Sequence, residues 1–131
     1  MVPDVSLNAN PSVGYAIYTR GSWWPYGGTS AAAPLWAAFA AQVNQARSAK
    51  GLPRLGFANP SLYQLGQSSL YGSSFNDIAD NSTNRFYPAV QGYDLSTGWG
   101  SIRGPGLLAA LSASELPPYP PASVNVVSGH D

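Results

Sequence analysis

The chain has 131 residues, the size of one ordinary domain. Asp, Glu, Lys and Arg together make up only 9% of the residues, whereas an average soluble protein has roughly a quarter. Six basic side chains balance six acidic ones, and neither kind forms a block. The sequence therefore offers no electrostatic footprint for nucleic acid or for an anionic membrane surface.

Cysteine is absent, which excludes disulfides, thiolate-bound metals and thiol catalysis within this chain. The longest apolar run, residues 31–43, is shorter than the roughly 20 residues that a membrane helix needs, and it contains Pro34. We therefore expect no membrane span. The first residues show no signal peptide, but the polar, weakly charged composition favours a secreted or extracellular protein.

The first half of the chain predicts an extended segment, a turn, a hairpin and a helix. Residues 2–6 are typical of extended chain, and residues 8–11 of a turn. Residues 14–26 carry aromatic and β-branched side chains on both sides of Arg20-Gly21-Ser22, which indicates a hairpin. Residues 31–49 are rich in Ala, Leu, Gln and Arg, which favours a helix.

The first half of this helix is apolar on every face, so we expect it to be buried and the polar second half to be exposed. Trp36 and Phe39 are predicted core residues, and Pro34 is expected in the first turn, where its missing N–H costs little. For Trp23–Tyr26 two interpretations stay open. The aromatic side chains either pack on the core or line a substrate cleft.

The second half of the chain predicts two shorter helices separated by loops. Residues 59–65 suit a helix with Asn59 as its N-cap, followed by a polar loop over 68–74. Residues 75–104 have little periodicity and are expected to form a long ordered loop, a kind that usually needs a ligand or partner. Residues 105–116 predict a final helix, and residues 117–131 form a Pro-rich tail or linker outside a domain of residues 1–116. The predicted core face of the final helix consists of Leu107, Leu108 and Leu111.

The run Gly27–Pro34 is the clearest candidate for a catalytic site. Its glycines favour a tight turn directly before the helix, which places Ser30 at the helix N-terminus. Free N–H groups and the positive end of the helix dipole would stabilise an oxyanion there, as a nucleophilic serine requires. The alternative is that Ser30 is an N-cap, which would contribute about 1 kcal/mol to helix stability.

A Ser-His-Asp triad is not expected within this chain, because its only histidine, His130, is the penultimate residue of the tail. Carboxylates would then have to act as the base. A second candidate site joins Asp77-Ile78 to Asp94 across a polar loop. Two carboxylates and backbone carbonyls are the oxygen ligands that Ca²⁺ prefers, although loop aspartates also cap turns without binding a metal.

The run Gly27-Gly28-Thr29-Ser30-Ala31-Ala32-Ala33-Pro34 resembles the nucleophile motif Gly-Thr-Ser-x-x-x-Pro of the subtilisin-like superfamily. Ala31 stands where subtilisins usually have Met, which favours the sedolisin (serine-carboxyl) peptidases. Further segments match that family in order and spacing from about residue 2 to residue 111. They are Val2–Ser6 with Gly14-Tyr15, Asn44-Gln45, Leu55–Tyr63, Phe75–Ile78 and Gly92–Gly100.

This resemblance implies an α/β fold, specifically the C-terminal portion of a subtilisin-like parallel sheet with flanking helices. It also implies endopeptidase activity on peptide or protein substrates at acidic pH, with Ser30 as the nucleophile. In sedolisins a Glu supported by an Asp takes the serine proton, and another Asp binds the oxyanion. Asp4 and Glu115 match none of these positions, so we expect a missing N-terminal part of the catalytic domain as a partner.

The resemblance also implies one Ca²⁺ ion. Its ligands would be the side chains of Asp77 and Asp94 and the carbonyls of Ile78, Val90 and Gly92. Asp80 has no counterpart in that site and is expected to face solvent. The competing hypothesis is a catalytically inactive, calcium-stabilised fragment or binding module, because none of these 131 residues is expected to deprotonate Ser30.

Overall fold

The computed structural model describes residues 3–116. It begins with extended chain and a short 3-10 helix, η1 (Pro11–Val13), which the Asn10 side chain caps by accepting a hydrogen bond from Ser12 N. The predicted tail of residues 117–131, with His130, lies outside the described residues, so the domain boundary stays a prediction.

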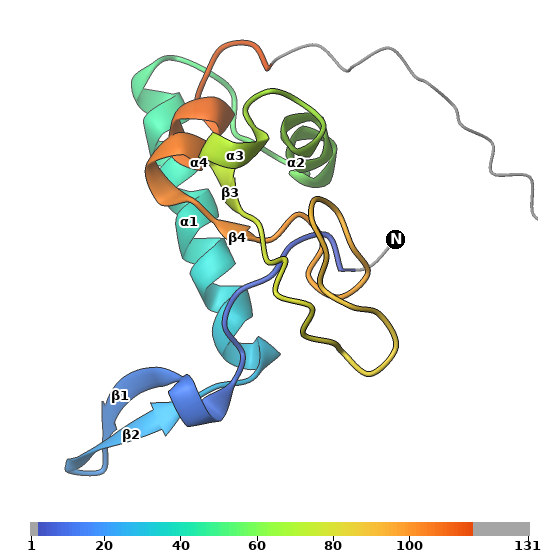
Figure 1. Cartoon of the computed structure of the whole chain (residues 1–131). Coiled ribbons are helices and arrows are strands. Elements are labelled where there is room, and N and C mark those ends of the chain that lie inside the picture. Colours follow the sequence, from blue (N-terminus) through green and yellow to red (C-terminus); the bar gives the residue numbers. More distant parts are fainter. Residues whose placement is uncertain (1–2, 117–131) are drawn as a thin grey trace, which may run out of the picture.

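The predicted hairpin is confirmed. Strands β1 (Tyr15–Thr19) and β2 (Ser22–Tyr26) pair antiparallel, with Thr19 opposite Ser22. Arg20 and Gly21 between them both have positive φ, 52° and 80°, which matches the twist of a two-residue hairpin turn. The hairpin projects from one end of the molecule (Figure 1). None of its strand residues is buried.

Helix α1 (Thr29–Ala49) begins two residues earlier than the sequence predicts. Pro34 is therefore its sixth residue and lies beyond the first turn, where it removes a hydrogen bond to the Ser30 carbonyl. The expectation of a wholly buried first half is wrong. Phe39 and Val43 are buried on one face, but Leu35 is 41% exposed. The described elements cover only that one face of α1.

The remaining elements gather beside the C-terminal half of α1 (Figure 1). They are α2 (Asn59–Gly66), α3 (Tyr71–Ser74), β3 (Phe75–Asn76), β4 (Ser101–Ile102) and α4 (Gly104–Leu111). Asn59 is the first residue of α2, and Ala58 is its N-cap, so the capping prediction is wrong. The loop predicted over 68–74 contains α3, and the final helix ends at Leu111, which leaves Glu115 exposed beyond it.

One hydrophobic core joins α1, α2, α4 and β3. Its buried side chains are Phe39, Val43, Leu62, Leu65, Phe75, Trp99, Leu107 and Leu111, and Trp36 and Leu108 pack against them. The predictions for Trp36 and Phe39 and for the leucine face of the last helix are therefore confirmed. The loop predicted over 75–104 is found only for residues 77–100, because β3, β4 and the first residue of α4 occupy its two ends. Within it the only bridges join Thr83 to Pro88 and Asp94 to Gly98.

The described residues combine helices with two small sheets, so the fold is mixed α and β. Both sheets are antiparallel and two-stranded, β1 with β2 and β3 with β4. The expected parallel sheet is not found within residues 3–116. Parallel neighbours need a crossover of a dozen or more residues between two strands, and the only long crossover here joins the two-residue strands β3 and β4 as an antiparallel pair. No helix in this part of the chain is long and apolar enough to cross a membrane.

Candidate functional site

Ser30 is the second residue of α1, and its side chain is exposed. The N-cap is Gly28, whose φ of 103° is a conformation that side-chain-bearing residues rarely adopt. No side chain caps the helix, so the interpretation of Ser30 as an N-cap is wrong. The Ser30 hydroxyl therefore lies beside the first-turn amides, of which that of Ala31 donates to Gly28 O, at the positive end of a 21-residue helix.

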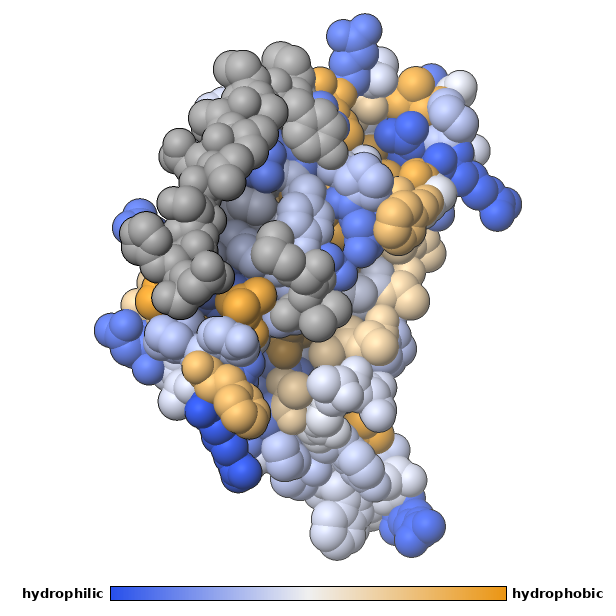
Figure 2. All heavy atoms as spheres, turned by 90° about the vertical axis from the view of Figure 1, so that its right-hand side faces the viewer, coloured by the Kyte–Doolittle hydropathy of each residue, from blue (hydrophilic) through white to orange (hydrophobic). Residues whose placement is uncertain are grey.

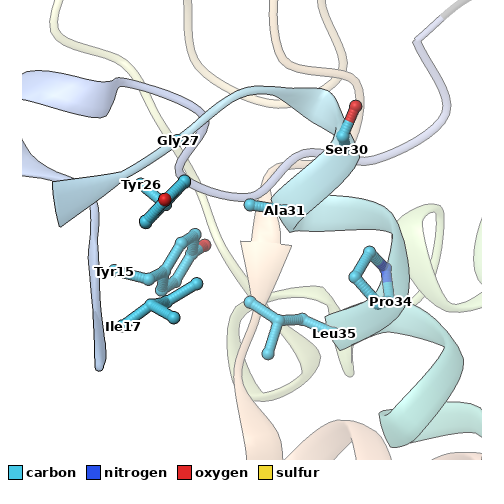
Figure 3. A pocket seen from close by; sticks show the side chains of 8 residues that line it. All are labelled: Tyr15, Ile17, Tyr26, Gly27, Ser30, Ala31, Pro34 and Leu35. Carbon is cyan, nitrogen blue, oxygen red and sulfur yellow. The ribbon is translucent and has the colours of Figure 1, made fainter. Parts of the chain in front are cut away.

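A cavity of about 400 Å³ opens beside Ser30, between the hairpin and the first turns of α1. In Figure 3 the rings of Tyr15 and Tyr26 lie on the hairpin side and Leu35 on the helix side, while the Ser30 hydroxyl lies at the rim and points away from them. The lining is predominantly apolar and includes no carboxylate or imidazole. It consists of Tyr15, Ile17, Tyr26, Gly27, Ser30, Ala31, Pro34 and Leu35.

The turn before Ser30 is held by the chain that precedes the hairpin. Gly28 N donates a hydrogen bond to Ala9 O. A Cβ atom at Gly27 would approach the backbone of Pro11 to 2.4 Å, so only glycine fits this crossing. The two glycines of the predicted tight turn thus have separate functions: Gly27 admits a neighbouring backbone, and Gly28 adopts the positive φ.

The aromatic run Trp23–Tyr26 does not pack on the core, so that interpretation is wrong. Trp23 is 69% exposed and contacts Tyr18 edge-to-face, with ring centroids 5.3 Å apart. Tyr26 alone of this run lines the cavity beside Ser30. The hairpin forms the lower end of the molecule in Figure 2. Most of the surface there is pale, which marks residues of intermediate hydropathy.

Asp4, for which the sequence predicts no function, is half-buried and accepts two side-chain hydrogen bonds. Its Oδ1 accepts a hydrogen bond from the Tyr63 hydroxyl at 2.9 Å, and its Oδ2 accepts one from Asn59 Nδ2 at 3.1 Å. Burial, and hydrogen bonds to the Tyr93 hydroxyl and the Asp4 carboxylate, raise the pKa of Tyr63. Asp4 therefore anchors the N-terminal segment to α2 and does not approach Ser30. The sequence hints at this anchoring contact only in that Asp4 is the single charged residue of the extended segment 2–6.

The long loop brings most of the predicted metal-site residues together. Asp77 Oδ2 accepts a hydrogen bond from Gly92 N at 2.9 Å. Asp94 is only 6% exposed, and its Oδ2 accepts one from Val90 N at 3.1 Å. Ile78 is half-buried and adjoins Asp77 in sequence. Asp80 is exposed, as expected, and hydrogen bonds from the Ser82 hydroxyl and from Ser82 N lower the pKa of its carboxyl.

The residues of this loop fit a bound cation. Asp77 Oδ1 is buried and has no hydrogen-bond partner, and a buried carboxylate oxygen is costly unless a donor or cation satisfies it. Burial, and the nearby Asp77 carboxylate with which the Tyr71 hydroxyl interacts, raise the pKa of Tyr71. Within residues 3–116 no three Asp, Glu, His or Cys side chains cluster, so a cation here would need backbone carbonyls as well. Such oxygen donors suit Ca²⁺.

Comparison with known proteins finds close sequence similarity to peptidases, although no family model matches the chain. Kumamolisin of Bacillus sp. (strain MN-32) is 45% identical over 121 residues, which cover 89% of this chain. Tripeptidyl-peptidase SED2 of Arthroderma otae is 39% identical over 103 residues, and tripeptidyl-peptidase sed1 of Aspergillus fumigatus is 38% identical over 104; each match covers 79% of this chain.

These matches show that the chain belongs to the sedolisin family of serine-carboxyl peptidases, as its motifs imply. The matched region is a small part of each relative. It spans 21% of kumamolisin, 15% of the Arthroderma protein and 14% of the Aspergillus protein.

Proposed function

We propose that this chain is the segment of a secreted, subtilisin-like serine-carboxyl endopeptidase that carries the nucleophile Ser30 and a calcium site. It would act on peptide bonds of peptide or protein substrates at acidic pH, completed by the N-terminal part of the catalytic domain. The observation that carries this proposal is the exposed hydroxyl of Ser30 at the N-terminus of α1, in a chain 45% identical to kumamolisin over 121 residues.

The chemistry would be acyl transfer. Attack of the Ser30 oxygen on a peptide carbonyl places negative charge on the carbonyl oxygen, and the first-turn amides and helix dipole of α1 are suited to stabilise it. The attack also needs a base. None of the residues that line the cavity beside Ser30 is a carboxylate or imidazole, and Asp4, Asp77, Asp80 and Asp94 make their hydrogen bonds elsewhere. The base and the oxyanion acid would therefore come from the completing part of the domain.

A carboxylate base can still accept a proton at acidic pH, where an imidazole base would already be protonated. A peptidase with a carboxylate base would therefore work at acidic pH. The completing part would also supply the parallel sheet of the subtilisin-like fold. The exposed apolar face of α1, including Leu35, is suited to pack against such a sheet.

Peptide hydrolysis by the chain, with and without a completing segment, tests this function. Because the base is lacking, we expect the 131-residue chain alone to cleave peptides at pH 3 to 5 no faster than its Ser30→Ala variant. Together with a co-expressed N-terminal part of a homologous catalytic domain, the wild type should cleave and Ser30→Ala should not. Equal activity of wild type and variant in the active, completed protein would contradict the proposal. Covalent labelling of Ser30 in the chain alone by an active-site reagent for serine peptidases would contradict the need for a completing N-terminal part.

The calcium site has its own test. When bound, Ca²⁺ would neutralise the Asp77 and Asp94 carboxylates and hold the loop through its oxygen ligands. A ligand bound only by the folded state adds about 2.7 kcal/mol at a hundredfold excess over Kd, which raises Tm by several degrees in a domain of this size. We expect this rise for wild type at neutral pH, comparing melts in Ca²⁺ and in chelator.

The matched variants are Asp77→Asn and Asp80→Asn, which remove one charge each from the same loop. Asp77→Asn should abolish the Tm rise, and Asp80→Asn should retain it, because Asp80 is exposed and bonded to Ser82. Lowering the pH should weaken the rise, since protons compete with the cation for the carboxylates. Coincident wild-type melts, or loss of the rise in Asp80→Asn alone, would show that the assignment is wrong.

A further inference from the structure

Residues 3–9, here called the N-terminal strap, contact both the start of α1 and the long loop of residues 77–100, here called the carboxylate loop. Figure 1 shows the strap running from the loop of residues 92–100 towards the hairpin and the first turn of α1. These two regions carry the proposed calcium site and the proposed nucleophile. In the part of the chain that the structure describes, the hydrogen bonds of Asp77 and Asp94 do not reach Ser30 or its neighbours, so the strap is the candidate for a physical link between the two regions.

The strap is bound to the carboxylate loop by its backbone. Three hydrogen bonds join them, from the Tyr93 hydroxyl to Pro3 O at 3.1 Å, from Trp99 N to Asp4 O at 3.0 Å and from Ser6 N to Gly100 O at 3.0 Å. The approach is close, because a Cβ atom at Gly98 would lie 2.3 Å from Asp4 O. Gly98 also has a φ of 63°. Any shift of this loop therefore displaces the strap.

The side chain of Asp4 adds a second anchor. Tyr63 donates to Asp4, as described above, and the Tyr63 and Tyr93 hydroxyl oxygens lie 3.5 Å apart. In the sequence Tyr93 lies between Gly92 and Asp94, and both of these neighbours belong to the predicted metal site. The Tyr93 ring packs on Trp99 with centroids 5.2 Å apart. The position of Tyr93 is thus tied to the metal-site residues by sequence and to the strap by its hydroxyl.

The other end of the strap is bound to α1. Ala9 O accepts the hydrogen bond from Gly28 N, immediately before the first turn. Ser6 O accepts one from Trp36 Nε1 at 3.4 Å. Gly28 is the N-cap of the helix whose second residue is Ser30. The strap therefore fixes the turn that sets the position of Ser30.

We infer that the N-terminal strap couples the carboxylate loop to the Ser30 turn, with Tyr93 and Asp4 as positioning residues, so that occupancy of the loop by Ca²⁺ orders the nucleophile-bearing end of α1. This inference rests on the proposed function. Coupling between two sites is reciprocal and needs an element whose equilibrium both sites bias. The strap is that element, since it is hydrogen-bonded to both.

Amide hydrogen exchange at Gly28 tests the coupling without recourse to activity. The experiment uses the 131-residue chain at neutral pH, with Ca²⁺ alone or chelator, and an independent Ca²⁺ titration by calorimetry. Exchange at Gly28 requires that its bond to Ala9 O open, so we expect saturating Ca²⁺ to slow it roughly fivefold, the effect of one hydrogen bond. The Tyr93→Phe variant should lose most of this slowing and bind Ca²⁺ severalfold more weakly.

Two further variants make the result specific. Tyr63→Phe removes the hydrogen bond to Asp4 and should also reduce the slowing at Gly28. Tyr87→Phe changes an exposed tyrosine of the same loop and should behave as wild type. Ca²⁺ binding in the titration without any slowing at Gly28, or slowing that Tyr93→Phe retains in full, would overturn the coupling while leaving the calcium site intact. Failure of the wild type to bind Ca²⁺ would overturn both the site and the coupling.

Discussion

At the scale of single residues, Asp94 is the most heavily bonded carboxylate of the described chain. Its Oδ1 accepts hydrogen bonds from Ser96 N and Thr97 N, both at 2.7 Å. Its Oδ2 accepts from Val90 N and from the Thr97 hydroxyl, both at 3.1 Å. Because a carboxylate can accept hydrogen bonds at both oxygens, Asp94 organises the loop even without a bound cation.

We therefore expect Asp94→Asn to destabilise the chain in chelator as well as in Ca²⁺. The amide NH₂ cannot accept the two hydrogen bonds that reach Oδ2, so the free energy of unfolding should fall by about 1–3 kcal/mol. Urea unfolding in chelator measures this loss. Asp80→Asn, on an exposed side chain, is the control and should change stability by no more than about 0.5 kcal/mol. Equal effects of the two substitutions would contradict a structural function for Asp94.

At the scale of elements, two tyrosines hold α2 and α3 against Trp99. The rings of Tyr63 and Tyr71 both meet the Trp99 indole edge-on, with centroids 5.9 Å and 5.6 Å away. Burial and neighbouring carboxylates raise the pKa of each hydroxyl, so the folded chain favours the neutral phenol. Tyrosine in the unfolded chain ionises near pH 10. Above that pH the unfolded state loses protons first and gains stability relative to the folded state.

The chain should consequently lose stability as the pH rises above about 10, while this contribution stays constant at lower pH. Denaturant unfolding at a series of pH values between 8 and 11 gives the slope. Tyr71→Phe and Tyr63→Phe should each make the alkaline slope shallower, whereas Tyr18→Phe, on the exposed hairpin, should not. A slope that all three variants share with wild type would refute this explanation.

At the scale of the whole molecule, the hairpin and the core are distinct regions. The hairpin contacts mainly itself and η1, and none of its strand residues is buried. The core lies among α1, α2, α4 and β3 at the other end of α1 (Figure 1). A two-stranded hairpin without a covering layer is only marginally stable.

We expect the hairpin to open locally while the core stays folded. Amides in paired positions of the strands, such as Ile17, should exchange orders of magnitude faster than the amide of Leu65, which lies in the core helix α2. Native-state hydrogen exchange measured by NMR provides the comparison within one sample. Protection of Ile17 equal to that of Leu65 would mean that the hairpin unfolds only with the core.

Much of this organisation is predictable from the sequence because it depends on local interactions. The hairpin follows from a Gly-containing turn between aromatic and β-branched residues, and α1 follows from its composition. The placement of Ser30 beside a helix N-terminus follows from the two glycines before it. The family is equally visible, because its motifs are short and ordered along the chain.

Only the tertiary structure decided which faces are buried and which residues meet. The apolar pattern of a helix does not show how many of its faces other elements cover. The exposure of Leu35 was therefore not predictable from the apolar residues around it in the sequence. Asp4 and Tyr63 are 59 residues apart, and their hydrogen bond depends on the path of the strap across α2. Local sequence determines elements and turns, whereas contacts between distant residues depend on the packing of all elements together.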